Sequence, residues 1–183
     1  MAVDTETSGL DWATDELHLC QVFSPATGTL LLRHVREVPR GLAALMEDPQ
    51  VIKVLHHAAF DLRFLEAHWG IRSTSVACTK TASKLLDPAI PAEEHSLRAL
   101  LQRYLGVSVT KGPVRTSDWN AAVLSDAQIA YATADVAHLL DLYDVLRERL
   151  QTEGLLHTFG QICAYIPVDA HLHVSGIPNP LVY

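Results

Sequence analysis

The pattern of apolar and polar positions predicts strands mostly in the first part of the chain and helices in the second. The opening stretch, MAVDTETSGL, starts apolar and is interpreted as a short strand. Residues 16–25 and 28–35 follow as two strand-like runs with a Pro- and Gly-containing turn between them, which predicts a hairpin. Apolar, β-rich runs predict a buried strand over residues 51–57 and a short one over residues 76–80.

Helical spacing of apolar residues recurs through the rest of the chain. It predicts helices over residues 38–49, 60–70, 81–87, 95–106 and 125–154. The last of these is the strongest, with Ser125 as N-cap, and its pattern fits one bent helix or two. A final helix is predicted near Leu155–Tyr165, before an irregular tail. Residues 107–119 have no clear period and contain Gly112-Pro113, which predicts a loop.

The order of these elements indicates the fold class. Strands come mostly first and helices later, with one β-α-β-α alternation in the middle, which predicts an α/β fold with helices on the faces of a mixed sheet. No repeat, low-complexity tract or long linker divides the sequence. We therefore expect residues 1–183 to form a single domain.

Composition and charge exclude several classes of protein. Of the 183 residues, 49 % are apolar and 19 % charged, which is typical of a globular chain. No apolar run approaches the roughly 18 residues of a membrane span, and no signal peptide precedes the first acids, so we expect a cytoplasmic protein without membrane contact. Three widely spaced cysteines without a CxxC pair fit reduced thiols. The net charge of -7 argues against binding along extended nucleic acid but permits a small phosphate-containing substrate held through metal ions.

Asp4 and Glu6 raise the question of chemistry. Side chains at i and i+2 of a strand point to the same face, so these carboxylates would lie together and repel. Solvation, a basic partner or bound cations would each compensate. An exposed acidic turn at Ser8-Gly9 is the plain alternative.

Two further acids occupy informative positions. Asp61 follows the strand predicted over residues 51–57, where it could reach the sheet end or serve as a helix N-cap. Asp135 lies among small residues within the long helix, one turn after Tyr131, either at the edge of the core or on the exposed surface. Four acids in three segments fit a site for two hard cations such as Mg²⁺, which can activate water for phosphodiester cleavage.

Three stretches, in this order, resemble the exonuclease motifs of the DEDD superfamily. They are VDTETSGL, HHAAFDLRFL and LSDAQIAYATADVAHLLDLY. The Tyr-x-x-x-Asp form of the third resembles the DEDDy branch, to which ribonuclease D belongs. The DEDDh branch would place His where this chain has Ala130. CTKTASKLLDP and RTSDW further resemble nano-RNase C, a ribonuclease D-like enzyme that degrades very short RNA.

The resemblance implies a ribonuclease H-like (DnaQ-like exonuclease) fold, a five-stranded mixed sheet flanked by helices. It implies a 3′-5′ exoribonuclease that releases nucleoside 5′-monophosphates from short RNA oligonucleotides or dinucleotides. Asp4, Glu6, Asp61 and Asp135 would bind two divalent cations, Mg²⁺ or Mn²⁺. Tyr131 would orient the attacking water, because a phenol with a pKa near 10 is a poor base at neutral pH. Leu10 would match the apolar wedge between the last two bases.

Other substrate contacts are expected on the same grounds. The full set of expected substrate-binding residues is Thr5, Leu10, His57, Phe60, Lys80, Lys84, Ser117 and Trp119, with Lys111 and Arg115 as further candidates for phosphate. For the lysine and arginine side chains, the alternative is a solvated surface charge without contact to substrate. For Trp119, the alternative is a place in the core or in an interface. The resemblance also implies a homo-oligomer, with a ring-shaped octamer as one form. The helical HRDC domain of ribonuclease D is not expected.

Other functions stay open at this stage. A general ribonuclease D-like or DNA-directed 3′-5′ exonuclease on longer strands is the alternative enzyme, and an inactive nucleic-acid-binding module is the non-enzymatic one. A histidine-based metal hydrolase is disfavoured. No HExxH or HD motif is present, and His56 and His57 are expected to end a strand and point to opposite faces.

Overall fold

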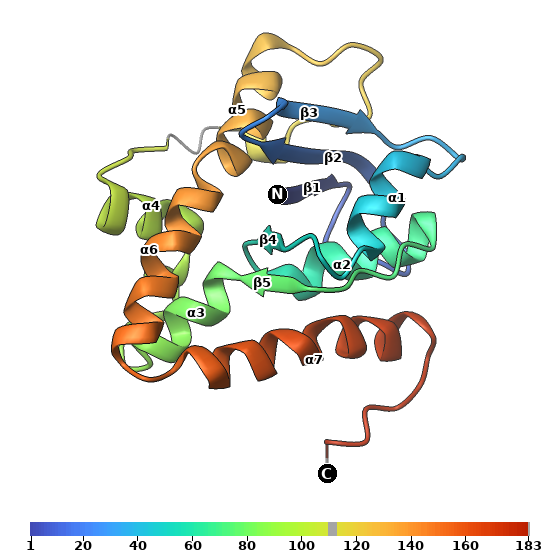
Figure 1. Ribbon diagram of the computed structural model, residues 1–183. Coiled ribbons are helices and arrows are strands. Elements are labelled where there is room, and N and C mark those ends of the chain that lie inside the picture. The colour runs from blue at the N-terminus through green and yellow to red at the C-terminus, as the bar shows by residue number, and fades with distance from the viewer. Residues whose placement is uncertain (110–112, 183) are drawn as a thin grey trace.

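The computed structural model describes residues 1–109 and 113–182. Its five strands form one sheet in the order β3-β2-β1-β4-β5 (Figure 1). Their bounds are β1 Ala2–Thr7, β2 Leu17–Ser24, β3 Gly28–Arg33, β4 Lys53–Leu55 and β5 Val76–Cys78. β1 pairs antiparallel with β2 and parallel with β4. β2–β3 is antiparallel and β4–β5 parallel, so the sheet is mixed, as predicted.

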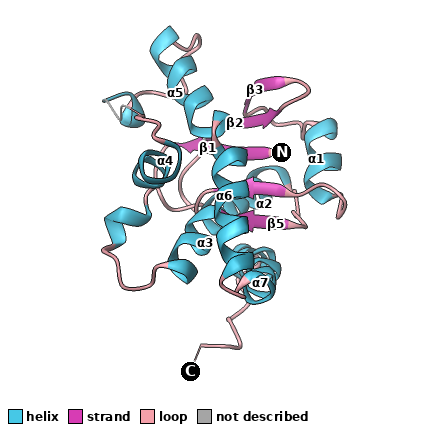
Figure 2. Cartoon of the chain, turned by 60° about the vertical axis from the view of Figure 1, so that its left-hand side comes forward, coloured by secondary structure: helices cyan, strands magenta, loops and turns pink. Residues whose placement is uncertain are grey.

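Helices follow and flank the strands. They are α1 Arg40–Glu47, α2 Ala58–Trp69, α3 Thr79–Leu86, α4 Leu97–Leu105, α5 Asp126–Ala137, α6 Leu139–Thr152 and α7 Leu156–Val174, with short 3₁₀ turns at Ala92–His95 and Pro113–Thr116. α5 packs against β1, β2 and β3. α7 lies beside α2 and β5 in both ribbon views (Figure 2). One buried apolar cluster extends from Ala2 in β1 to Ala170 in α7, so residues near both ends of the chain share one core.

The hairpin and most helices lie where the sequence predicts them, and the differences have local causes. The long helical stretch is two helices, α5 and α6, which meet at His138. The last helix continues to Val174 instead of ending near Tyr165, so the expected irregular tail is wrong for these residues. α7 contains Pro167, a residue that ordinarily signals a helix end, but packing against α2 and β5 outweighs that preference.

The strand predicted over residues 51–57 is also shorter than expected. β4 ends at Leu55, and His57 adopts a left-handed conformation with φ of 68° as the N-cap residue of α2. Non-glycine residues are uncommon in that region and often lie at functional sites. The expectation that His56 and His57 end a strand is therefore wrong.

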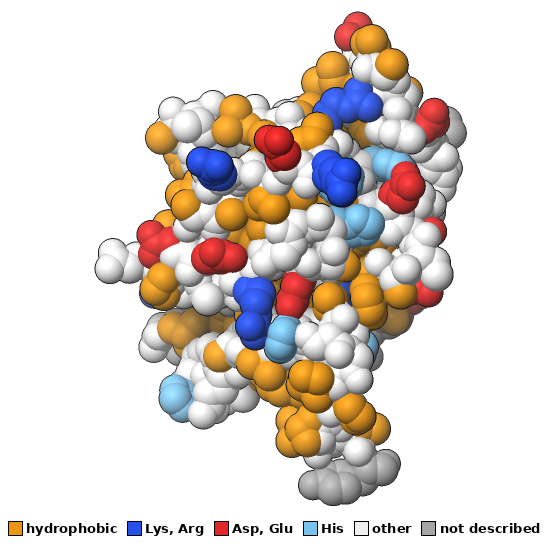
Figure 3. Space-filling view, turned by 90° about the vertical axis from the view of Figure 1, so that its right-hand side faces the viewer, with side chains coloured by type: hydrophobic (Ala, Val, Ile, Leu, Met, Phe, Trp, Pro, Cys, Tyr) orange, Lys and Arg blue, Asp and Glu red, His pale blue; other side chains and the backbone are white. Residues whose placement is uncertain are grey.

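The surface adds two observations. On the face in Figure 3, basic and acidic side chains are interspersed and form no basic track. Among the helices of the described residues, none is long and apolar enough to cross a membrane.

Candidate active site

The first strand brings Asp4 and Glu6 to one face of the sheet. β1 lies in the middle of the sheet, and its pairing register is regular until an irregularity between Glu6 and Thr7. Asp4 is half-buried and Glu6 is buried. Their opposite numbers on β2 are Gln21 and Leu19, whose side chains share this face. An exposed acidic turn, the plain alternative for these acids, is therefore excluded.

Helix α5 adds a third carboxylate to this face. Asp135 is buried, and one oxygen each from Asp4, Glu6 and Asp135 lie within 4.8 Å of one another. Of the two positions that the sequence allows, the buried one is observed. Three converging carboxylates repel unless positive charge or donors compensate, and carboxylate oxygens are the ligands that Mg²⁺ and similar cations prefer. The donor set therefore fits a divalent cation.

Asp61 approaches the site from helix α2. It is not a helix N-cap, because His57 holds that place and Asp61 lies inside the first turns. Its side chain is 2 % exposed, and Oδ1 accepts a hydrogen bond of 2.7 Å from the Thr5 hydroxyl. Burial raises the pKa of Asp61 to about 7, although the hydrogen bond from Thr5 favours the charged form.

Tyr131 lies one helical turn before Asp135 on α5 and is buried. Burial raises the pKa of its phenol well above the ordinary value, and the nearby carboxylates of Asp135 and Glu6 raise it further. The hydroxyl is therefore neutral at physiological pH, and its hydrogen bond to the Asp135 side chain also favours the protonated form. The ring packs against Trp119 at 5.9 Å between centroids.

All five residues of the motif line one cavity of about 270 Å³. Asp4, Glu6, Asp61, Tyr131 and Asp135 share this lining with Thr5, Leu10, His56, His57, Phe60 and Leu97. A second cavity of about 520 Å³ shares four of its lining residues (Thr5, Glu6, Leu10 and Phe60) and reaches Ser117 and Trp119. The five motif residues thus come from three chain segments that are far apart in sequence, and they converge on one cavity.

Several expected substrate contacts lie around these cavities. Leu10 is 83 % exposed and borders both of them. Phe60 is half-buried, and its ring lies nearly parallel to His57 at 6.5 Å. Burial lowers the pKa of His57, and the positive charges of Lys80, Lys84 and Arg63 lower it further. These three basic side chains therefore lie near His57, at the edge of the cavity. Lys80 and Lys84 line neither cavity.

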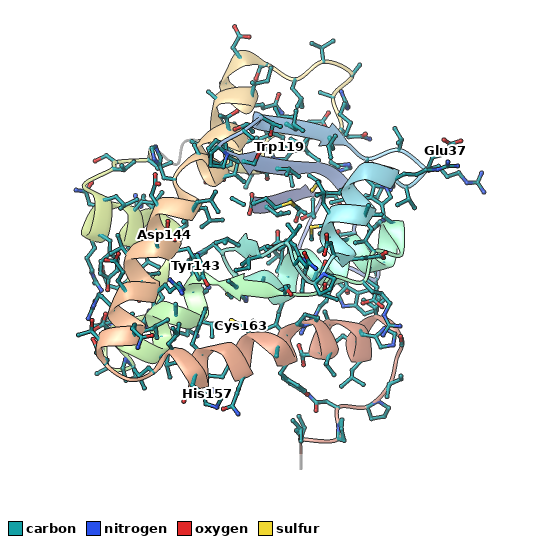
Figure 4. The ribbon with its side chains drawn as sticks, in the orientation of Figure 1. Glu37, Trp119, Tyr143, Asp144, His157 and Cys163 are labelled. Carbon is teal, nitrogen blue, oxygen red and sulfur yellow. The ribbon has the colours of Figure 1, made fainter. Side chains whose placement is uncertain are left out.

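The remaining expected contacts are less open. Trp119 is 3 % exposed and belongs to a buried cluster with Leu19, Tyr131 and Ala132, between α5 and strands β2 and β3 (Figure 4). Its ring face is therefore not free to stack on a base in this structure. Ser117 is half-buried and accepts a hydrogen bond from Gln128. Lys111 and the side chain of Arg115 fall outside the described part of the chain.

Sequence reasoning missed three polar residues that organise this region. Gln21 donates to both Asp4 and Glu6 from the neighbouring strand. Gln128 completes a capping box with Ser125, a signal that the Ser-x-x-Gln spacing carries. Arg33 at the end of β3 donates to the carbonyl oxygens of residues 120–122, and no local pattern could reveal this contact.

Comparison with known proteins gives consistent results. A model of the 3′-5′ exonuclease family matches residues 1–151. Ribonuclease D of Gluconacetobacter diazotrophicus is 38 % identical over 115 residues, which is 63 % of this chain and 28 % of that protein. The chain therefore spans less than a third of the length of this curated relative.

Solved structures match over the whole chain. Brucella melitensis NrnC with bound Mg²⁺ is 32 % identical, with a TM-score of 0.89, and the match covers 100 % of this chain and 89 % of that one. The same protein bound to pGG is also 32 % identical over the same shares of both chains, with a TM-score of 0.88. The five-stranded arrangement and the order of its helices are thus those of an exonuclease fold.

Proposed function

This chain belongs to the 3′-5′ exonuclease family, in its ribonuclease D-like DEDDy branch, and we propose that it removes nucleotides from the 3′ end of short single-stranded RNA, down to dinucleotides. The reaction is phosphodiester hydrolysis, with nucleoside 5′-monophosphates as products. The observation that carries the proposal is the convergence of Asp4, Glu6 and Asp135 beside Tyr131 in one cavity.

The acids would form the cation site. Asp4, Glu6 and Asp135 would hold one divalent cation, Mg²⁺ or Mn²⁺, because their oxygens already converge. Asp61 lines the same cavity and would contribute to a second. When bound, such cations lower the pKa of water and neutralise charge on the phosphate. Asp61 must lose its proton to take part, and its raised pKa makes this step sensitive to pH near neutrality.

Tyr131 would act through its hydroxyl hydrogen. Because its pKa is raised, the phenol stays protonated and is unsuited to remove a proton at neutral pH. It can donate a hydrogen bond that orients the attacking water or a phosphate oxygen. Trp119, packed on the ring, would hold it in place.

The substrate would enter past Leu10 and Phe60. Leu10 is exposed at the border of both cavities, where it could insert between two bases. Phe60 and His57 offer ring surfaces beside the acids. Lys80 and Lys84, close enough to His57 to lower its pKa, would attract phosphate groups.

The preference for short RNA rests on a relative. The likeness to NrnC covers the whole chain, and one of its structures holds pGG. A general exonuclease on longer RNA or DNA is the second candidate, because ribonuclease D is also a relative.

A substrate series separates these candidates. 5′-labelled RNA of two, three, seven and twenty nucleotides, and DNA of the same lengths, would be incubated with Mn²⁺ or with EDTA. We expect the RNA dinucleotide to be cut fastest and EDTA to stop all cleavage. Equal trimming of all lengths would favour the general exonuclease. Binding without cleavage at any length, with cations present, would favour an inactive module.

Three wider features belong to the same proposal. Residues 1–183 would act as one exonuclease domain, since one core joins β1 to α7.

The protein would self-associate, and exposed Ile177, Leu181 and Val182 offer apolar contact area for this. It would work in the cytoplasm, where its free, buried cysteines suit a reducing compartment. Light scattering after size-exclusion chromatography would measure the oligomer, and a monomer at all concentrations would contradict self-association.

A further inference from the structure

Gln21 occupies an unusual place for an amide. It lies in the middle of β2, directly opposite Asp4 in the pairing register, and is completely buried. Its Nε2 donates to Oε1 of Glu6 at 3.1 Å and to Oδ2 of Asp4 at 3.4 Å. Its Oε1 is buried and has no hydrogen-bond partner among the residues that the structure describes.

The chemistry of the amide fixes its orientation. A glutamine side chain has two N–H donors and one carbonyl acceptor. Turning the group over would place the carbonyl oxygen against two carboxylates, which is repulsive. Both donors are therefore directed at Asp4 and Glu6, and the acceptor is left unpaired.

The unpaired Oε1 of Gln21 lowers the stability of the folded state. A buried acceptor without a partner destabilises the folded state, and a leucine of similar size would avoid that cost. Packing in β2 therefore does not explain why position 21 holds an amide, because an apolar side chain would pack equally well. Its two donors act on the two acids, so its function is to be sought there.

We propose that Gln21 is a positioning residue for the cation site, which holds Asp4 and Glu6 in the arrangement that binds a divalent cation. The inference rests on the cation site of the proposed function. Each carboxylate that accepts one N–H retains further lone pairs for a cation. The residue acts on the acids and not on the substrate.

A neutral donor suits this task better than a charged one. Lysine or arginine at position 21 would also pair with the acids, but its positive charge would oppose cation binding by simple repulsion. The amide restrains both side chains and leaves the negative charge of the cluster intact. Partners that orient metal ligands in this way typically affect metal affinity about 10- to 100-fold.

The test compares two buried glutamines. Gln21→Leu removes the donors and the unpaired acceptor at similar volume. Gln128→Leu is the matched control, because Gln128 is also buried but binds Ser117 and the Asp118 carbonyl instead of the acids. Mn²⁺ affinity is measured by calorimetry, and the melting temperature is measured on metal-free protein.

Opposite patterns are expected from the two variants. Gln21→Leu should weaken Mn²⁺ binding about 10- to 100-fold and leave the metal-free melting temperature close to that of the wild type. Gln128→Leu should lower the melting temperature and leave Mn²⁺ affinity unchanged. Gln21→Met, with a flexible apolar chain of similar length, should repeat the result of the leucine variant.

Failure of the inference and failure of the proposed function can be distinguished. If the wild type binds Mn²⁺ and both Gln21 variants bind it equally well, the positioning role is overturned and the cation site stands. If both Gln21 variants fail to fold, the amide serves stability and the inference is also overturned. If the wild type itself binds no Mn²⁺, the proposed cation site is rejected, and the positioning role of Gln21 is rejected with it.

Discussion

The hydroxyl of Thr5 donates a 2.7 Å hydrogen bond to Oδ1 of Asp61 and thereby joins the first strand to helix α2. The two residues are 56 positions apart in the chain. Thr5 thus stabilises the charged form of an acid whose burial favours the neutral form. This balance leaves Asp61 with a pKa of about 7, so the charge of this acid changes near neutral pH in the metal-free protein.

Metal-free protein should lose stability as pH rises toward neutrality. The pKa of Asp61 is raised in the folded state from 3.8 to about 7, so the unfolded chain loses this proton first. The stabilisation is complete below about pH 4 and is lost as pH rises through 7, at about 1.4 kcal/mol for each pKa unit. Thermal melts in EDTA from pH 4 to 8 measure this loss. Asp61→Asn should flatten the profile, and an unchanged slope would contradict the assignment.

Thr5→Val should shift the acidic limb of the activity profile to higher pH. The substitution removes the hydrogen bond at nearly constant volume, so the pKa of Asp61 should rise further, by up to about one unit. Activity at pH 6 should therefore fall more than activity at pH 8. Thr152→Val, which removes a hydroxyl bonded to the Glu148 carbonyl on α6, is the control and should leave the profile unmoved.

Asp135→Asn should reduce cleavage at least about 100-fold and abolish the heat of Mn²⁺ binding, because it removes a ligand from the three-carboxylate group. The metal-free melting temperature should stay level or rise, since one repelling charge is gone. Asp144→Asn is the control, because that acid is exposed on α6 (Figure 4). Full activity of Asp135→Asn would defeat the site assignment.

Tyr131→Phe should lower kcat about 100-fold or more while Mn²⁺ affinity is retained. The ring still packs on Trp119, but the hydroxyl hydrogen that orients water or phosphate is lost. Tyr143→Phe provides the comparison, since Tyr143 packs against Phe159 outside the cavity and should be nearly silent. Loss of Mn²⁺ binding in Tyr131→Phe would show that the phenol serves the cations instead.

Arg33→Ala should lower kcat several-fold without changing Mn²⁺ affinity. Arg33 donates to three carbonyl oxygens just after Trp119, at 2.6 to 3.4 Å, and this loop supports Tyr131. Its loss should loosen the loop and speed its cleavage in limited proteolysis. Arg36→Ala, at an exposed position shortly after β3, serves as the reference. Equal proteolysis and equal kcat in both variants would refute this role.

The sequence alone determined the parts that depend on backbone periodicity. The two-residue repeat of a strand places Asp4 and Glu6 on one face, and the four-residue spacing of a helix does the same for Tyr131 and Asp135. The hairpin and the Ser125 cap follow from equally local signals. These preferences arise within a few residues, so one sequence is enough to reveal them.

Tertiary structure decided which of these segments meet. The bond from Thr5 to Asp61, the amide of Gln21 beneath two acids and the contact of Arg33 with the Trp119 loop each join distant segments. Packing also extended α7 through Pro167, against the local preference of that residue. Such contacts depend on strand register and on the fit of whole helices to the sheet. Burial set the pKa of Asp61 in the same way, because desolvation is a property of the folded surroundings and not of the residue.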